Sequence, residues 1–249
     1  MTRTVRLGVF GIAAAGMAAL ILWGLAGLPD FGRYHWPYGN VLNAVAPAER
    51  HTTNVVGVTV FDYRGFDTLG EEFILFAAVV GVSLLLRKDP DEHVPADEVR
   101  SDAIRVLGAV ASALLFVLGL WVVAFGYVTP GGGFQGGVVL AGAFLLVYVA
   151  GGYRQYHKLV PHSPVEMAEA LGAGAFAVLG FVGVASTGAY LGNFLGIGNA
   201  GSLYSGGSVP LLNWATAIEV SGAMVVLFSE FLKIYVVPAV EWTPERGPR

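Results

Sequence analysis

The sequence has no cysteine and few charged residues. Without cysteine, the chain has no disulfide bonds, no thiolate chemistry and no cysteine-ligated iron–sulfur cluster. Only 13% of the 249 residues are charged, against about a quarter in a typical soluble domain. The formal net charge of −4 says little by itself, because in a membrane protein the position of the charges matters more than their sum.

Long apolar runs replace the missing charge. Hydrophobic residues make up 55% of the chain, and the mean hydropathy is +0.65. Runs of about 18 or more apolar residues recur, which is typical of transmembrane helices. The pattern predicts an all-α membrane protein with about six transmembrane helices, at residues 7–28, 68–86, 106–128, 133–151, 168–191 and 210–237. The first run also suits a signal peptide, but it exceeds the usual core of about 7–15 residues, which favours a retained helix.

Lys and Arg are unevenly divided between the two sides of this six-helix topology. One side has 11 of them: Arg3, Arg6, Arg87, Lys88, Arg100, Arg105, Arg154, Lys158, Lys233, Arg246 and Arg249. The other side has three: Arg33, Arg50 and Arg64. Since cytoplasmic loops carry an excess of Lys and Arg, this bias predicts that both termini are cytoplasmic. The dense charge at residues 87–103 predicts a solvated linker.

A glycine-rich stretch joins the third and fourth predicted helices. Its motif comprises Pro130, Gly131, Gly132, Gly133, Phe134, Gln135, Gly136 and Gly137. Gly133, Gly137 and Ala141 recur at every fourth residue, a pattern that lets two helices approach closely in lipid. Residues 138–150 alone are too short to cross a bilayer, so the fourth helix is expected to begin near Gly133. Helix packing leaves Gln135 unexplained, and a phosphate-binding loop is excluded because no Lys-Ser or Lys-Thr follows.

Two carboxylates fall inside the last predicted helix. Carboxylates within a membrane are costly and are functional candidates by default. Glu219 lies roughly 13 Å from the helix start, near the bilayer middle, and either handles ions or holds a subunit interface. Glu230 is 11 residues further, which returns it to nearly the same helix face. Pairing with Lys233 at i+3 is the favoured explanation for Glu230, and a second station of an ion path is the alternative.

The remaining polar residues give weaker signals. Glu71 and Asp67 are further ion-path candidates, although both lie at a predicted helix start where the helix dipole favours anions. The same explanation suffices for Glu72, Glu166 and Glu169.

Asp62 and Arg64 are close in sequence to Asp67 and suggest an interfacial ion-pair cluster. His157 and His162 are expected in a solvated loop at residues 153–166, not in a metal site. No catalytic motif or cofactor motif is found in the sequence.

Two motifs resemble known families. Residues 130–138 resemble the signature of the MrpB (MnhB) subunits of multisubunit Na⁺/H⁺ antiporters, and this resemblance extends over residues 104–237, including Glu219. Asn54-Val-Val and residues 61–71 are similar to the MbhE-like region. That region closes the large MrpA subunit in antiporters and is a small separate subunit in membrane-bound hydrogenases. The resemblances imply an MbhE-like two-helix module (1–88), a charged cytoplasmic linker (89–103) and an MrpB/MnhB-like four-helix module (104–249).

The resemblance implies a subunit of a complex that exchanges external H⁺ for internal Na⁺ in a prokaryotic plasma membrane. The implied partners are large MrpA-like and MrpD-like subunits, small Mrp subunits, Na⁺, H⁺ and membrane lipid, with no nucleic acid, no cofactor and no enzymatic activity. The role would be accessory to the large ion-translocating subunits. Two alternatives stay open: a membrane-arm subunit of a redox-driven pump related to complex I, and a purely structural bridging subunit.

Overall fold

The computed structural model describes residues 3–28, 37–86, 99 and 101–236. Within these residues the regular elements are all helices, accompanied by one isolated β-bridge between Gly198 and Ser205. Six of the described helices are long and apolar enough to cross a membrane. The predicted all-α fold with six membrane helices is therefore confirmed. Most of the predicted linker at 89–103 lies outside the described residues.

The chain divides into two compact units, Met1–Asn40 and Val41–Arg249. The first unit contains α1 (Arg3–Ala26), a long apolar helix with no buried side chain. Helix α2 (Pro37–Arg50) runs from the first unit into the second.

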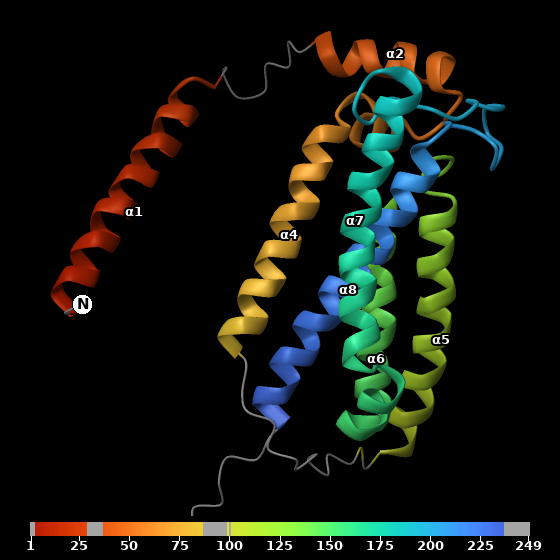
Figure 1. The fold of residues 1–249 in the computed structure, drawn as a ribbon. Helices are drawn as coiled ribbons and strands as arrows, with labels where there is room; N and C mark the ends of the chain where they lie inside the picture. The colour runs from red at the N-terminus through yellow and green to blue at the C-terminus, as the bar shows by residue number, and fades with distance from the viewer. Residues whose placement is uncertain (1–2, 29–36, 87–98, 100, 237–249) are drawn as a thin grey trace, which may run out of the picture. The chain divides into compact units, whose positions relative to one another are not determined.

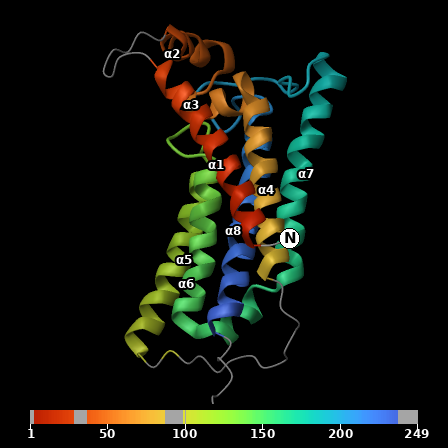
Figure 2. The same cartoon turned by 90° about the vertical axis from the view of Figure 1, so that its left-hand side faces the viewer.

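The second unit is a helix bundle built around α8. After α2 come α3 (Val55–Val58), the π-helix η1 (Thr59–Tyr63), α4 (Gly65–Leu86), α5 (Asp102–Ala124), α6 (Gly133–Leu159), α7 (His162–Thr187) and α8 (Val209–Val236). Helix α8 packs against α4, α6 and α7 and lies among them in both views (Figure 1, Figure 2). In its apolar stretch 61% of the residues are buried, against 11% in α4 and in α5. Polar side chains on α8 are therefore largely shielded from lipid.

The glycine-rich stretch packs α6 against two neighbouring helices. As predicted, α6 begins at Gly133. A Cβ at Gly133 would lie 2.9 Å from the Thr216 Cβ of α8, and one at Gly137 would lie 2.9 Å from the Val220 Cβ. A Cβ at Gly136 would lie 3.0 Å from the backbone nitrogen of Val123 at the end of α5. The predicted small-residue packing face is confirmed, and it is directed at α8.

The glycines before Gly133 are explained by a tight return of the chain onto α5. A Cβ at Gly131 would lie 2.8 Å from the Val122 carbonyl oxygen, and Gly132 has a left-handed φ of 154°. The Asn54 side chain caps α3 and donates to the carbonyl oxygens of Gly126 (2.6 Å) and Thr129 (3.1 Å). The turn is thus fixed to the segment that precedes α4, and both Phe134 and Gln135 are exposed.

The predicted loop at residues 153–166 is wrong, because most of it is helical. Helix α6 continues to Leu159, bent at Gly152 where φ is 72°, and α7 begins at His162. The buried Tyr156 explains the extension: its hydroxyl makes a 2.9 Å hydrogen bond with Ser229 Oγ of α8. The basic and histidine residues of this segment favoured a loop in the sequence. The contact between Tyr156 and α8 instead keeps the segment helical.

The predicted cluster of Asp62, Arg64 and Asp67 divides into two pairs. Arg64 Nε donates to Asp67 Oδ2 at 2.6 Å, whereas Asp62 accepts from Arg50 Nε at 2.7 Å. Asn193, in the segment between α7 and α8, also donates to Asp62 Oδ2 at 3.0 Å. Asp62 therefore joins α2, η1 and a loop that precedes α8, which local sequence spacing does not indicate.

Tyr63, at the end of η1, should ionise late in an alkaline titration. Its hydroxyl donates to Glu49 Oε2 at 2.6 Å, and burial together with this bond raises the pKa of Tyr63 to about 12. The protonated phenol is favoured in the folded state, so its stabilisation is complete below about pH 10 and is lost as the pH rises toward 12. Tyrosinate absorbance in wild type minus Tyr63→Phe should show one transition near pH 12. A transition near pH 10 would contradict the hydrogen bond between this half-buried phenol and Glu49.

Candidate functional site

Three glutamates from three helices are buried inside the bundle. Glu72 of α4 is 3% exposed, Glu169 of α7 is 4% exposed and Glu219 of α8 is fully buried. Each lies well within a helix that is long enough to span a membrane. Glu219 follows the start of α8 by about 15 Å, and Glu72 follows the start of α4 by about 10 Å. Carboxylates at such depth are costly and mark functional sites by default.

Helices α7 and α8 cross through a reciprocal glutamate–glycine contact. Both helices carry the pattern Glu-x-x-Gly, as Glu169 to Gly172 and Glu219 to Gly222. A Cβ at Gly172 would lie 2.7 Å from the Glu219 Cα, and one at Gly222 would lie 3.0 Å from the Glu169 Cα. Each glycine therefore makes room for the backbone and Cβ of the glutamate opposite. This arrangement brings the two carboxylate-bearing positions to one crossing point.

Glu72 completes the cluster from the α4 side. Its carboxyl group lies close to the Glu219 carboxyl group and the Thr216 hydroxyl, without a hydrogen bond of regular geometry to either, and Glu219 also has an electrostatic interaction with Glu169. Glu72 and Val79 lie on the face of α4 that is turned toward α8, where Val79 packs against Ala223 and Val226. We call Glu72, Glu169 and Glu219 the carboxylate cluster.

Several buried oxygens of this region have no hydrogen-bond partner among the described residues. They are both carboxyl oxygens of Glu219, Glu72 Oε2, Glu169 Oε1, Thr216 Oγ1 and Asn213 Oδ1. A buried polar atom without a partner costs free energy, and a buried charge costs more. Protons, water or a small cation are the groups that would satisfy such oxygens. The carboxylate cluster is therefore a buried polar site whose oxygens need such groups as partners.

A second polar group lies further along α8. Glu230 is 5% exposed, and its Oε1 accepts from Lys233 Nζ at 2.6 Å and lies 2.8 Å from His162 Nε2. His162 Nδ1 is also 3.1 Å from Glu166 Oε2. The predicted Glu230–Lys233 pair is confirmed. His162, expected in a solvated loop, instead joins α7 to α8.

The structure separates the remaining sequence candidates from the cluster. Glu71 is exposed, next to the buried Glu72, and Asp67 is exposed and paired with Arg64. Glu72 and Glu169, expected as helix-start residues, lie in the cluster. Two sequence signals could have identified them. Glu72 lies at helical spacing from the apolar residues Leu75 and Val79, which places it on the same helix face. Glu169 is followed three residues later by glycine, as is Glu219. Within the described residues no group of three or more His, Cys, Asp and Glu side chains forms a metal site.

Comparison with known proteins identifies the family. A model described as a domain related to the MnhB subunit of Na⁺/H⁺ antiporters matches residues 103–226, and the MbhE model, which describes one subunit of the MBH complex, matches residues 4–100. An uncharacterized protein of Methanocaldococcus jannaschii is 33% identical over 190 residues, which are 67% of this chain and 72% of the relative. The chain belongs to the MnhB-related family. It is a multi-pass membrane protein of that family.

Other similar proteins come from large membrane complexes. The A/B subunit of a probable K⁺/H⁺ antiporter of Rhizobium meliloti is 34% identical over 128 residues, which are 41% of this chain and 13% of that protein. A chain of the archaeal membrane-bound sulfane sulfur reductase is 30% identical with a TM-score of 0.71, over 93% of this chain and 99% of that chain. A chain of the Mrp complex of Dietzia sp. shares the fold, at 22% identity and a TM-score of 0.65, over 92% of this chain and 26% of that chain.

Proposed function

We propose that this MnhB-related chain is a subunit of a cation/proton antiporter complex in which the carboxylate cluster relays protons. The observation that carries the proposal is the burial of Glu72, Glu169 and Glu219 at one helix crossing, with unpartnered oxygens at each of them. The K⁺/H⁺ antiporter relative of Rhizobium meliloti supports proton-coupled cation exchange as the overall activity.

The relay would run along α8. Glu72 is about 10 Å from the start of α4, Glu219 is about 15 Å from the start of α8, and Glu230 is about 32 Å from it. Glu169 lies opposite Gly222, between Glu219 and Glu230. A proton would pass from Glu72 to Glu219 and on to Glu169. His162 and Glu230 then offer an exit at the far end of α8, because a histidine gains and loses protons near neutral pH. The sequence candidates Glu71 and Asp67 are both exposed and are not part of the proposed relay.

The role is accessory to large ion-translocating subunits. Within the described spans the only Lys or Arg side chains lie near helix ends, at Arg3, Arg6, Arg105, Arg154, Lys158 and Lys233. The proposed partners are large MrpA-like and MrpD-like subunits with small Mrp subunits, in the plasma membrane of a prokaryote. Both chain termini are proposed to be cytoplasmic on the Lys and Arg bias. Residues 1–88 and 104–249 are proposed as MbhE-like and MrpB/MnhB-like modules joined by residues 89–103.

A second candidate is a membrane-arm subunit of a redox-driven complex. The sulfane sulfur reductase chain favours it, because this chain covers 99% of that chain at 30% identity. In such a complex the same carboxylate cluster would relay protons, and cysteine-ligated iron–sulfur clusters would belong to other subunits, since this chain has no cysteine.

Affinity purification of the full chain in mild detergent, with mass spectrometry of the retained proteins, tests the proposal. The expected result is one particle that contains large antiporter-like subunits and no iron–sulfur or nickel proteins. Redox subunits in that particle would replace the antiporter assignment with the second candidate. A chain that is purified alone would contradict both.

A further inference from the structure

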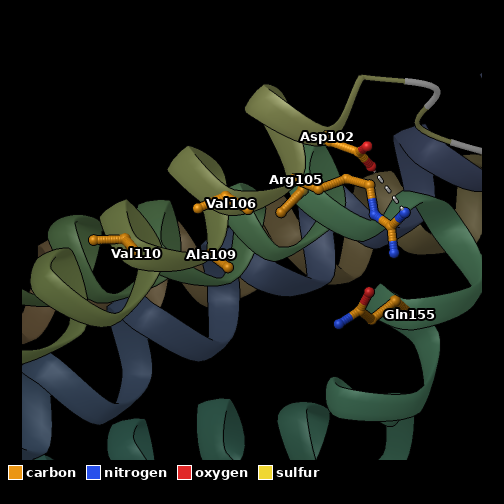
Figure 3. Close-up of a pocket in the computed structure, with 7 residues that line it drawn as sticks. Asp102, Arg105, Val106, Ala109, Val110 and Gln155 are labelled. Atoms are coloured by element: carbon orange, nitrogen blue, oxygen red, sulfur yellow. Dashed lines mark hydrogen bonds and ion pairs between the residues drawn. The ribbon is translucent and has the colours of Figure 1, made fainter.

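A pocket at one end of α5 and α6 has the chemistry of a lipid-headgroup site. It has a volume of about 510 Å³ and opens outward between the first two turns of α5 and the last part of α6. Asp102 and Arg105 line it at the start of α5, and Gln155 lines it from α6. In Figure 3 the Arg105 guanidinium and the Gln155 amide face each other across the gap, with Asp102 beside Arg105.

The apolar side of the pocket continues from the polar end toward the bilayer. Val106, Ala109 and Val110 follow Asp102 and Arg105 on one face of α5, at helical spacing. Val106 is 63% exposed and Val110 is 54% exposed. Val110 lies about 12 Å from the helix start. A molecule with a charged head at the membrane boundary and an apolar chain below it fits this gradient.

The charged pair at the rim leaves both of its members able to bind a ligand. Arg105 Nη1 and Asp102 Oδ1 are 3.5 Å apart, and their side chains are 61% and 94% exposed. An exposed pair at that separation is weak. The guanidinium keeps donors for a phosphate, and the carboxylate keeps acceptors for an ammonium group.

Gln155 lies three residues after a bend in α6. The left-handed φ of 72° at Gly152 interrupts the helix just before Gln155. A Cβ at Gly151 would overlap the Gln155 amide oxygen. The absence of a side chain at Gly151 therefore leaves space for the amide group. The Gln155 amide nitrogen can donate to an ester or phosphate oxygen near Arg105.

The geometry points to this pocket as a binding site for one zwitterionic aminophospholipid. Its phosphate binds Arg105 and Gln155, its ammonium group binds Asp102, and its first acyl segment lies on Val106 and Val110. The presence of one cation and one anion at the rim selects a phosphoethanolamine head over a phosphoglycerol head, which has no ammonium group for Asp102.

The test uses the intact complex in mild detergent with equal amounts of phosphatidylethanolamine, phosphatidylglycerol and phosphatidylcholine of identical acyl chains. Native mass spectrometry counts the retained lipids. We expect wild type to prefer phosphatidylethanolamine, and Arg105→Gln to retain about tenfold less of it, as the loss of one charge-assisted contact predicts. Asp102→Asn should abolish the preference over phosphatidylglycerol. Arg154→Gln is the matched control: Arg154 is exposed on the same part of α6 but is not a lining residue.

Two results would overturn the site. Equal retention of phosphatidylethanolamine by Arg105→Gln and Arg154→Gln would show that Arg105 does not bind it. If the Arg105→Gln complex fails to assemble, a second measurement tests the site. The chain has no cysteine, so Val110→Cys gives it a single thiol, and a bifunctional thiol-to-amine reagent tests for a neighbouring subunit. Cross-linking to protein in place of labelling by a photoactivatable phosphatidylethanolamine would identify the pocket as a subunit interface.

Discussion

Glu219→Gln is expected to lower proton-coupled cation transport by the complex by about tenfold or more, with assembly unchanged. Glutamine keeps the size of the side chain and hence the packing of Glu219 against Gly172. It removes the only group at this position that can carry a proton. The measurement is the rate of antiport in everted vesicles, read with a pH-sensitive dye, together with the yield of intact complex.

Glu71→Gln is the matched control for this prediction. Glu71 adjoins Glu72 in the sequence, but it is exposed while Glu72 and Glu219 are buried. Its substitution removes one negative charge from the same protein without changing a member of the carboxylate cluster, so transport should stay near the wild-type rate. Unchanged transport in Glu219→Gln would instead leave the carboxylate cluster as a structural element between α7 and α8.

Gly172→Ala is expected to destabilise the bundle by about 1–3 kcal/mol, the usual cost of an added methyl group in a tightly packed contact. The new Cβ would lie 2.7 Å from the Glu219 Cα, a backbone atom that cannot rotate away. Helices α7 and α8 must then separate, which also moves Glu169 from Glu219. The measurement is the thermal unfolding midpoint of the purified complex, followed by its transport rate.

Gly174→Ala tests whether the effect belongs to the helix crossing. Gly174 is two residues further along α7, and a Cβ there would meet nothing within 4 Å. Alanine is the better helix former, by roughly 0.5–1 kcal/mol, so this variant should melt at the same temperature or slightly higher. Equal destabilisation by both substitutions would mean that α7 and α8 do not pack as described.

The membrane helices and the glycine motif were predictable from sequence because both are local. A helix that crosses a bilayer needs about 20 apolar residues in a row, and such runs gave the spans of α4, α5 and α8 closely. The start of α6 at Gly133 followed from the same length requirement. The small-residue spacing of Gly133 and Gly137 predicted a packing face but not its partner, since a pattern on one helix carries no information about the helix opposite.

The membership of the site was decided by tertiary structure. Glu71 and Glu72 are adjacent and chemically identical in sequence, yet only Glu72 faces α8. Similarly, the sequence explains Glu169 by its place in the first turns of a helix. In the structure the crossing with α8 buries it. His162 is joined to Glu230 across 68 residues.

The sequence by itself therefore determined how many helices are long and apolar enough to cross a membrane, where most of them lie, and which family motif the chain carries. The tertiary structure alone decided which carboxylates meet. Hydropathy and glycine spacing act over a few turns of one helix, whereas the burial of a carboxylate depends on how separate helices are rotated against one another. That rotation is set here by Gly172 and Gly222, whose missing side chains admit Glu219 and Glu169.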